Sequence, residues 1–192
     1  MVTTEPEDPR ITRTREAVLD AVAELLTEEG WERVTHQRVA ERSGYARSTV
    51  YRHWPERIDL LRGLSDRAEQ MSHPERVTGD LRSDLLGELL AYRDVLFDRG
   101  GGATLAALIG VAEHSDGADA VRAASVARGE TPVRDLLRSA VDDGRLAAGL
   151  DPAAGASELF GPITHRRLMT RTRPDDAELA DLVDGFIAHR GA

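Results

Sequence analysis

The hydrophobic residues near the start of the chain recur every three or four positions, which is the spacing of one helix face. They are Val18, Val22, Leu25 and Leu26. This stripe predicts a helix over residues 12–29, and Gly30 ends it because glycine accepts the left-handed conformation common after helices. The polar and acidic residues 1–9 are expected to form a disordered lead before that helix.

Two short helices and a longer one are predicted next. Thr35 is a favourable N-cap for a helix that ends at Ser43 and Gly44. The following helix covers residues 46–54, and Pro55 stops it. Pro55 can itself be the first residue of a fourth helix, whose apolar positions continue to about residue 71, before a boundary at residues 73–74.

The middle of the chain carries broader apolar stripes. The stripe over residues 81–97 covers much of a helix circumference and therefore predicts a central helix. The three glycines at 100–102 are expected to break that helix as a turn. A further helix follows over residues 105–112. Asp116 is the expected cap of the next one, which continues to residue 144 with a candidate kink at Pro132.

The last forty residues predict two helices with recognisable starts. Asp151 and Pro152 have the favoured order of a capping residue followed by a first-turn proline. Asp175 and Glu178 form a capping-box pattern before a clean apolar stripe. No strand pattern is convincing, so the chain is predicted to be all-α, with about nine helices.

Composition excludes several classes of protein. The absence of cysteine removes disulfides, thiolate metal sites and cysteine nucleophiles. No apolar run approaches the ~18 residues that span a bilayer, and the acidic N-terminus is unlike a signal peptide. A cytoplasmic protein without a membrane partner is therefore expected. No nucleophile-elbow, phosphate-loop or zinc-protease motif occurs, so neither enzymatic activity nor a cofactor or metal is expected.

The net charge of −9 is unevenly distributed. Residues 33–57 contain six arginines against the two carboxylates of Glu41 and Glu56, a local charge of +4, so the rest of the chain carries −13. A basic island on an acidic body is typical of a DNA-binding protein with a separate second function. A chance cluster of solvated arginines would give the same pattern.

Residues 35–54 have the organisation of a helix-turn-helix. A short helix ends at Gly44, a few residues turn the chain, and a second short helix presents polar side chains. Val39, Val50 and Trp54 would hold the two helices against the first long helix. The opposite face of the second helix would then be free to enter a DNA major groove, which is wide enough for one helix.

Over residues 15–61 the sequence resembles the TetR (tetracycline-repressor-like) family of bacterial transcriptional regulators. The matching anchors are Ala17, Leu25, Gly30-Trp31, Val34-Thr35, Val39-Ala40, Ser43-Gly44, Thr49-Val50-Tyr51, His53-Trp54-Pro55, Arg57 and Leu60-Leu61. The resemblance implies a three-helix DNA-binding domain over residues 10–56, followed by a larger helical ligand-binding and dimerisation domain over residues 57–192. It implies a regulator, by default a repressor, that binds a palindromic operator as a homodimer and is released by a small-molecule effector.

The resemblance also implies roles for individual residues. Thr35 and His36 would bond phosphate, and Arg57, in place of the usual lysine, would neutralise one. Arg47 is the best candidate for a bidentate contact with guanine. The complete set of implied DNA-binding residues is Thr35, His36, Gln37, Tyr45, Arg47, Ser48, Thr49, Tyr51, Arg52, His53 and Arg57.

Tyr51 and four nearby arginines can also be interpreted without any contact to DNA. Tyr51 is either a groove contact or a side chain half-buried against the first helix. Arg38 and Arg42 fit a solvated helix face better than base contact. Arg10 and Arg13 could reach a minor groove as an arm before the first helix, although a disordered arm without a role is the more common case.

Two residues depart from the family pattern. Ala46 stands where the family has serine, threonine or glycine as N-cap of the recognition helix, and the loss of that cap costs about 1 kcal/mol. Tyr45 replaces a small aliphatic residue in the turn, where it either contacts DNA or covers the core.

The second domain carries expectations drawn mainly from the family. The two C-terminal helices, over residues 151–171 and 176–190, are the candidates for a self-complementary dimer interface. His114 and His165 could orient a polar effector group. The candidate pocket residues, each of which could equally be plain core, are Leu86, Leu89, Leu90, Phe97, Leu105, Ile109, Val126 and Phe160. A ligand-independent DNA-binding or architectural protein, whose second domain only dimerises, is the alternative.

Overall fold

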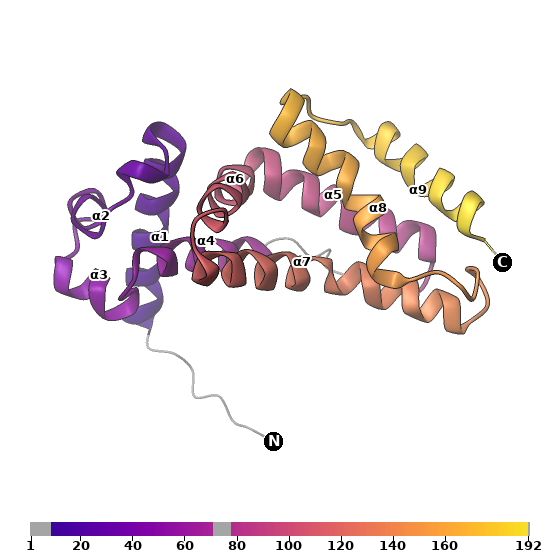
Figure 1. Cartoon of the computed structure of the whole chain (residues 1–192), viewed down its shortest axis with the longest axis horizontal. Helices are drawn as coiled ribbons and strands as arrows, with labels where there is room; N and C mark the ends of the chain where they lie inside the picture. Colours follow the sequence, from indigo (N-terminus) through magenta and orange to yellow (C-terminus); the bar gives the residue numbers. More distant parts are fainter. Residues whose placement is uncertain (1–8, 71–77, 192) are drawn as a thin grey trace, which may run out of the picture. The chain divides into compact units, whose positions relative to one another are not determined.

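A computed structural model describes residues 9–70 and 78–191 of the chain (Figure 1). These ranges contain nine α-helices and no β-strand, which confirms the all-α prediction. The chain divides into two compact units, residues 1–65 and 66–192. The predicted lead, apart from Pro9, and the predicted boundary at residues 73–74 lie outside the described ranges.

The first unit contains α1 (Pro9–Glu29), α2 (His36–Ser43), α3 (Arg47–His53) and the first part of α4 (Arg57–Gln70). A 3-10 turn, η1 (Trp31–Arg33), joins α1 to α2. Each α-helix contributes buried apolar side chains, because its hydrophobic residues fall on one face. The main ones are Val18, Val22, Leu25, Val39, Val50, Leu60 and Leu61, together with Trp54 at the C-cap of α3.

The start of α1 differs from the expectation. The helix begins at Pro9 rather than at residue 12, so Arg10 and Arg13 are exposed side chains of its first turns and not an extended arm. Proline is well tolerated in a first helical turn because it has no N–H to lose there. The Thr14 hydroxyl also donates to the Arg10 carbonyl at 2.8 Å, within this helical segment.

Trp54, at the end of α3, packs against Gly63 of α4. A Cβ atom on Gly63 of α4 would lie 2.8 Å from Trp54 Nε1 and 2.9 Å from Leu19 Cδ2. Glycine at this position therefore lets α4 pack directly on the indole ring, which is only 4 % exposed.

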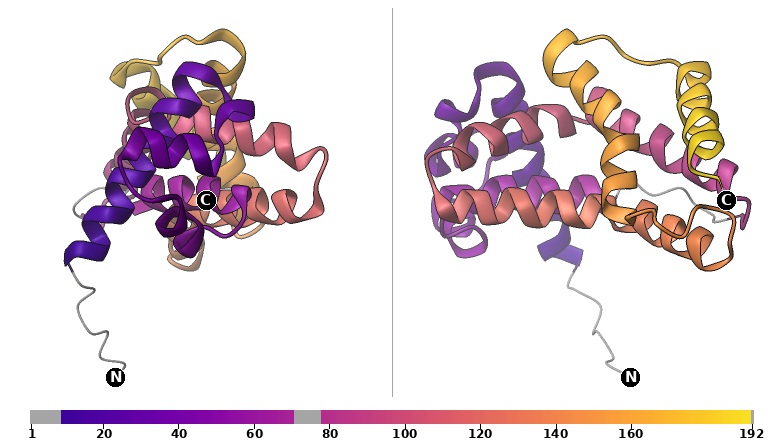
Figure 2. Two further views of the ribbon diagram at one scale, coloured as in Figure 1. Left: turned by 90° about the vertical axis from the view of Figure 1, so that its left-hand side faces the viewer. Right: turned by 45° about the vertical axis from the view of Figure 1, so that its right-hand side comes forward.

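The second unit contains five further α-helices. They are α5 (Leu81–Asp98), α6 (Gly101–Ala112), α7 (Asp116–Asp142), α8 (Pro152–His165) and α9 (Asp176–Arg190). Helices α6 and α7 form an antiparallel hairpin, and α8 and α9 pack against α5 (Figures 1 and 2). Helix α8 continues as a π-helical turn, η2 (Arg166–Thr170), and Arg171 then adopts a positive φ of 55°. The core between these helices includes Leu85, Leu89, Leu137, Leu159, Ile163, Val183 and Phe186.

Helix starts in this unit follow the predicted chemistry, with one exception. The capping box is present: the Asp175 carboxylate accepts from the Glu178 amide at 2.8 Å, and Glu178 accepts in return from the Asp175 amide at 2.9 Å. Asp151 caps α8 as expected. Helix α7, by contrast, is capped by Ser115, whose hydroxyl accepts from the Ala118 amide. Asp116 is instead the first helical residue, where the positive end of the helix dipole stabilises its negative charge.

The corner between α5 and α6 shows why three glycines stand together. Only Gly100 is the turn, with a positive φ of 78°, whereas Gly101 and Gly102 already belong to α6. A Cβ on Gly102 would lie 2.5 Å from the Leu96 carbonyl oxygen and would collide with the guanidinium of Arg167. That guanidinium donates to the same Leu96 carbonyl at 2.9 Å. The predicted three-residue break is thus a one-residue turn followed by a tightly packed helix start.

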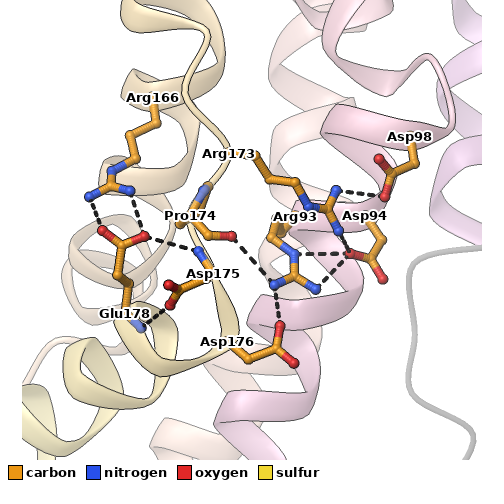
Figure 3. A network of polar contacts seen from close by, with 9 residues as sticks. All are labelled: Arg93, Asp94, Asp98, Arg166, Arg173, Pro174, Asp175, Asp176 and Glu178. Carbon is orange, nitrogen blue, oxygen red and sulfur yellow. Dashed lines mark hydrogen bonds and ion pairs between the residues drawn. The ribbon is translucent and has the colours of Figure 1, made fainter.

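Arginines fasten the segment between α8 and α9 to α5 (Figure 3). Arg93 of α5, only 7 % exposed, bonds the carboxylate of Asp176 and donates to the Pro174 carbonyl at 3.4 Å. Arg173 reaches back from that segment to Asp94 and Asp98 of α5. These bonds hold the start of α9 against α5.

A bidentate ion pair joins η2 to the first turn of α9. Arg166 donates to both carboxylate oxygens of Glu178, at 2.6 and 2.8 Å (Figure 3). The hydrogen bond from Arg166 lowers the pKa of Glu178 below its ordinary value. The ion pair therefore favours the ionised form of Glu178, which accepts in the capping box.

Candidate nucleic-acid interface

The helix-turn-helix is formed by α2, the turn at residues 44–46, and α3. Thr35 caps α2 by accepting from the Arg38 amide, and Gly44 ends it with a positive φ of 75°. Val39 and Val50 are fully buried on the inner faces of the two helices. The two short helices are therefore fixed from behind, as the sequence predicts.

The outward face of α3 is polar. Arg47, Ser48, Tyr51 and Arg52 are exposed, while Thr49 is half-buried. Tyr51 is 39 % exposed, so it is neither a core residue nor a fully solvated one. The helical spacing places Ser48 and Arg52 on the face opposite Val50, with Arg47 and Tyr51 at the edge of that face.

Three side chains form a continuous contact across the two short helices. The rings of His36 and Tyr51 are stacked, with centroids 4.0 Å apart and planes 6° apart. His36 Nε2 lies 2.6 Å from the Trp54 carbonyl oxygen. Arg47 donates from Nη2 to the Tyr51 hydroxyl at 3.1 Å, with its Cζ 5.2 Å from the Tyr51 ring centroid. The imidazole of His36 is thus buried and bonded within the helix-turn-helix, whereas Arg47 is exposed to solvent.

The guanidinium of Arg57 also forms its hydrogen bonds within the protein. It donates from Nε to the Val34 carbonyl at 2.6 Å and from Nη2 to the Trp31 carbonyl, and its guanidinium lies 4.1 Å over the Trp31 ring. Burial lowers the pKa of Arg57 from its ordinary value. Arg57 therefore braces the loop that leads into the Thr35 cap. Its contact with phosphate stays a prediction.

The basic island is partly neutralised from α1. Arg38 makes a bidentate ion pair with Glu29, at 2.5 and 2.6 Å. Arg42 donates to Glu24 at 3.1 Å and Glu28 at 3.0 Å. The hydrogen bond from Arg38 lowers the pKa of Glu29. Both arginines are paired with glutamates of α1, so the exposed positive charge of the island is carried mainly by Arg33, Arg47 and Arg52. Whether Arg38 and Arg42 contact DNA stays a prediction.

The remaining candidate residues surround α3. Gln37 is exposed and donates to Glu41 at 2.9 Å. Tyr45 is half-buried in the turn, and His53 is half-buried beside Trp54, with ring centroids 5.6 Å apart. None of these arrangements depends on DNA, so their assignment to DNA contacts stays a prediction.

Ala46 is the N-cap of α3 and makes no side-chain cap bond. Its backbone is already extended, as a capping serine requires, with φ −62° and ψ 140°. We expect Ala46→Ser to raise the free energy of unfolding by about 1 kcal/mol, because a hydroxyl would accept from a first-turn amide, as the Thr35 hydroxyl does in α2. Chemical denaturation measures this. Ala106→Ser, on the exposed side of α6, is the control, and a similar gain there would contradict the capping explanation because serine is the poorer residue inside a helix.

The candidate pocket residues are distributed between the core and the surface of the second unit. Leu89 and Phe160 are buried in the core. Leu86, Leu90, Phe97 and Leu105 pack partly buried against it. Ile109 and Val126 are 38 % and 36 % exposed. Their assignment to a ligand stays a prediction.

A pair of hydroxyl groups next to Phe160 was not predicted from the sequence. The Tyr92 and Thr164 hydroxyls lie 2.7 Å apart, and the Tyr92 ring packs on Phe160 with centroids 4.5 Å apart. Burial raises the pKa of the Tyr92 hydroxyl. The signal available in the sequence was a lone tyrosine within an otherwise aliphatic stripe. His114 and His165, the residues considered for this role, are both exposed.

The described ranges contain neither a metal-binding cluster nor a single membrane-spanning helix. No group of three or more histidine and acidic side chains there could hold a metal ion. No single helix of that part is long and apolar enough to cross a membrane; α5 and α6 pass such a test only as a pair, and the chain bends by 78° between them.

Comparisons with known proteins agree with this geometry. Residues 18–64 match the profile of bacterial regulatory proteins of the tetR family, and residues 76–186 match the tetracyclin repressor-like C-terminal domain. The DNA-binding transcriptional repressor TetR of Mycobacteroides abscessus is 31 % identical over 186 residues, covering 91 % of this chain and 92 % of the relative.

Solved structures show the same fold. The TetR-family transcription regulator SCO0332 is 32 % identical, with a TM-score of 0.69 over 92 % of this chain and 97 % of that one. A complex of SmeT with triclosan has a TM-score of 0.69 over 94 % of this chain and 92 % of that one, at 21 % identity. The helix-turn-helix, the helical second unit and both family matches together show that this chain belongs to the tetR family of bacterial regulatory proteins, which are DNA-binding transcriptional regulators.

Proposed function

We propose that the protein is a homodimeric repressor that binds a palindromic operator through α3 and releases it when a small molecule binds the second unit. The observation that carries the DNA-binding part is the two-sided character of α3. Ser48 and Arg52 are exposed on the side opposite the fully buried Val50, and Arg47 is exposed at the edge of that side. Such a helix can enter a major groove without disturbing its own packing.

Dimerisation is supported by the shortness of the reading helix. Helix α3 has seven residues and reaches only a few base pairs, so two half-sites are needed for useful specificity. Helices α8 and α9 supply a suitable surface, because exposed small residues allow a second pair of helices to approach closely. These residues are Ala154, Gly161, Ala177, Gly185 and Ala188.

Effector binding is assigned to residues 57–192, and DNA binding to residues 10–56. The Tyr92 and Thr164 hydroxyls, next to Phe160, offer hydrogen bonds within apolar surroundings, which is the usual composition of a small-molecule site. SmeT, which shares the fold, has been solved with triclosan. The Mycobacteroides relative is named a repressor, and operator occupancy can block transcription without any further contact surface.

The test begins with duplexes selected from a random pool by the protein. We expect Arg47→Ala to weaken binding to the selected duplex by about 10- to 100-fold, because a bidentate arginine–guanine contact is worth about 1–3 kcal/mol. Weak binding to unrelated DNA should remain and should fall steeply with salt. Competition titration measures both, and light scattering should find two chains, or a multiple of two, on each duplex.

The control is Arg138→Ala, because Arg138 is an exposed arginine of α7 paired only locally with Asp135. It should leave binding unchanged. If the unsubstituted protein binds all duplexes equally, it is an architectural DNA-binding protein. If Arg47→Ala binds as the unsubstituted protein does, α3 is not the reading helix.

A further inference from the structure

His36 is the first residue of α2, and its side chain bonds the C-terminal end of α3. Its ring is buried, 8 % exposed, and Nε2 lies 2.6 Å from the Trp54 carbonyl oxygen. Because a carbonyl only accepts, Nε2 carries the hydrogen in this bond. Trp54 is the C-cap of α3, and the carbonyls at a helix end lack partners within the helix. The histidine therefore supplies a partner that a purely apolar residue at position 36 could not.

The same imidazole is the platform for Tyr51. The near-parallel stack, at 4.0 Å and 6°, covers one face of the phenol ring with a ring that is itself held by burial, at 8 % exposed. An exposed tyrosine on a helix would otherwise exchange between rotamers. Tyr51 is thus held at an orientation set by a residue of the other helix.

Tyr51 in turn fixes Arg47, one helical turn earlier. The guanidinium donates to the Tyr51 hydroxyl at 3.1 Å, and its Cζ lies 5.2 Å from the ring centroid. An unrestrained arginine loses much rotamer freedom when it binds a base, so holding it beforehand favours binding. These contacts form a relay from the buried His36 ring through Tyr51 to Arg47.

We propose that His36 is a positioning residue for base recognition, which orients Arg47 through Tyr51 without touching DNA itself. This inference rests on the proposed function in one respect, namely that Arg47 reads a base. Its consequence is specific: removing the His36 ring should relax discrimination at the base pair that Arg47 reads, while discrimination at other positions is kept.

Two substitutions separate the stack from the hydrogen bond. His36→Gln keeps a donor for the Trp54 carbonyl and loses the ring, whereas His36→Phe keeps a ring on Tyr51 and loses the donor. We expect His36→Gln to lower discrimination at the Arg47 base pair by about tenfold, and His36→Phe to keep it within about threefold. A merely structural role would predict the opposite order, because it would follow the melting temperatures, which should favour the variant that keeps the buried hydrogen bond.

The measurement is competition binding of each variant to the selected operator and to its single-base-pair substitutions. In the Arg47→Ala background, His36→Gln should cause no further loss at that position, since two residues of one relay are not additive. Uniform weakening on every duplex, or an unchanged profile, would overturn the proposal.

A second readout needs no DNA. The Arg47 Nε–H bond of the unbound protein, followed by NMR relaxation, should gain mobility in His36→Gln and not in His36→Phe. If Arg47 is equally mobile in the unsubstituted protein and both variants, the relay does not exist, whatever the DNA result. If its mobility changes as expected but the unsubstituted protein shows no base preference, the proposed function has failed and the relay has not.

Discussion

Gly102→Ala is expected to destabilise the second unit by about 3 kcal/mol, although alanine is normally the better helix residue. The new methyl group would lie 2.5 Å from the Leu96 carbonyl oxygen, an atom of the α5 backbone that cannot simply rotate away. It would also displace the guanidinium of Arg167 and so break the 2.9 Å bond to that carbonyl. Thermal and chemical denaturation, followed by circular dichroism, measure the change.

The same helix offers the matched control. A Cβ on Gly110 would meet nothing within 4 Å, and the position is exposed. Gly110→Ala should therefore stabilise the protein by about 0.5–1 kcal/mol through the lower entropy of the unfolded chain. Two identical substitutions eight positions apart should have opposite signs. Equal gains at both positions would show that the α5–α6 corner is loosely packed and that the contact with Arg167 is unimportant.

This corner shows what could be predicted from sequence and what could not. The break itself follows from the three glycines, because glycine interrupts a helical stripe. The close packing on Gly102 depends on an arginine 65 positions later, which the periodicity of α6 does not reveal. Local signals such as the Asp175 and Glu178 box are more reliable, because both partners lie within one turn.

The candidate DNA-binding site divides in the same way. The helix-turn-helix could be located because its caps, turn and buried positions are set by neighbours in sequence. The orientation of His36 could not, because the carbonyl that it bonds belongs to Trp54, eighteen positions away. Arg57 likewise finds its acceptors in the loop between α1 and α2.

The basic island illustrates the limit of counting charges along a chain. Arg38 and Arg42 contribute to the local charge of +4, but their partners Glu24, Glu28 and Glu29 precede the counted residues. The surface charge offered to DNA is consequently smaller than the sequence suggests. Exposed ion pairs of this kind contribute little stability, so we attribute to them mainly the orientation of α2 on α1.

Trp54→Ala is the substitution expected to have the largest effect on the first unit, a loss of about 4 kcal/mol in the free energy of unfolding. The indole is 4 % exposed and fills the space above Gly63, where α4 has no side chain of its own. Alanine would leave a cavity that the surrounding helices cannot close, since Leu19 and Val50 are already packed. Trp54→Phe should lose much less, because it keeps most of the ring volume.

The loss should be local and should carry the DNA-binding activity with it. Hydrogen exchange resolved along the chain should show faster exchange of the amides of α1, α2 and α3, with those of α5 to α9 unchanged, because Trp54 packs on Gly63 within the first of the two compact units. Ile11→Ala, which removes a 39 % exposed side chain from α1, is the control and should change neither stability nor exchange appreciably. Equal acceleration in both units would instead mean that they unfold together, and that the Trp54 contact with Gly63 stabilises the whole chain rather than the reading head alone.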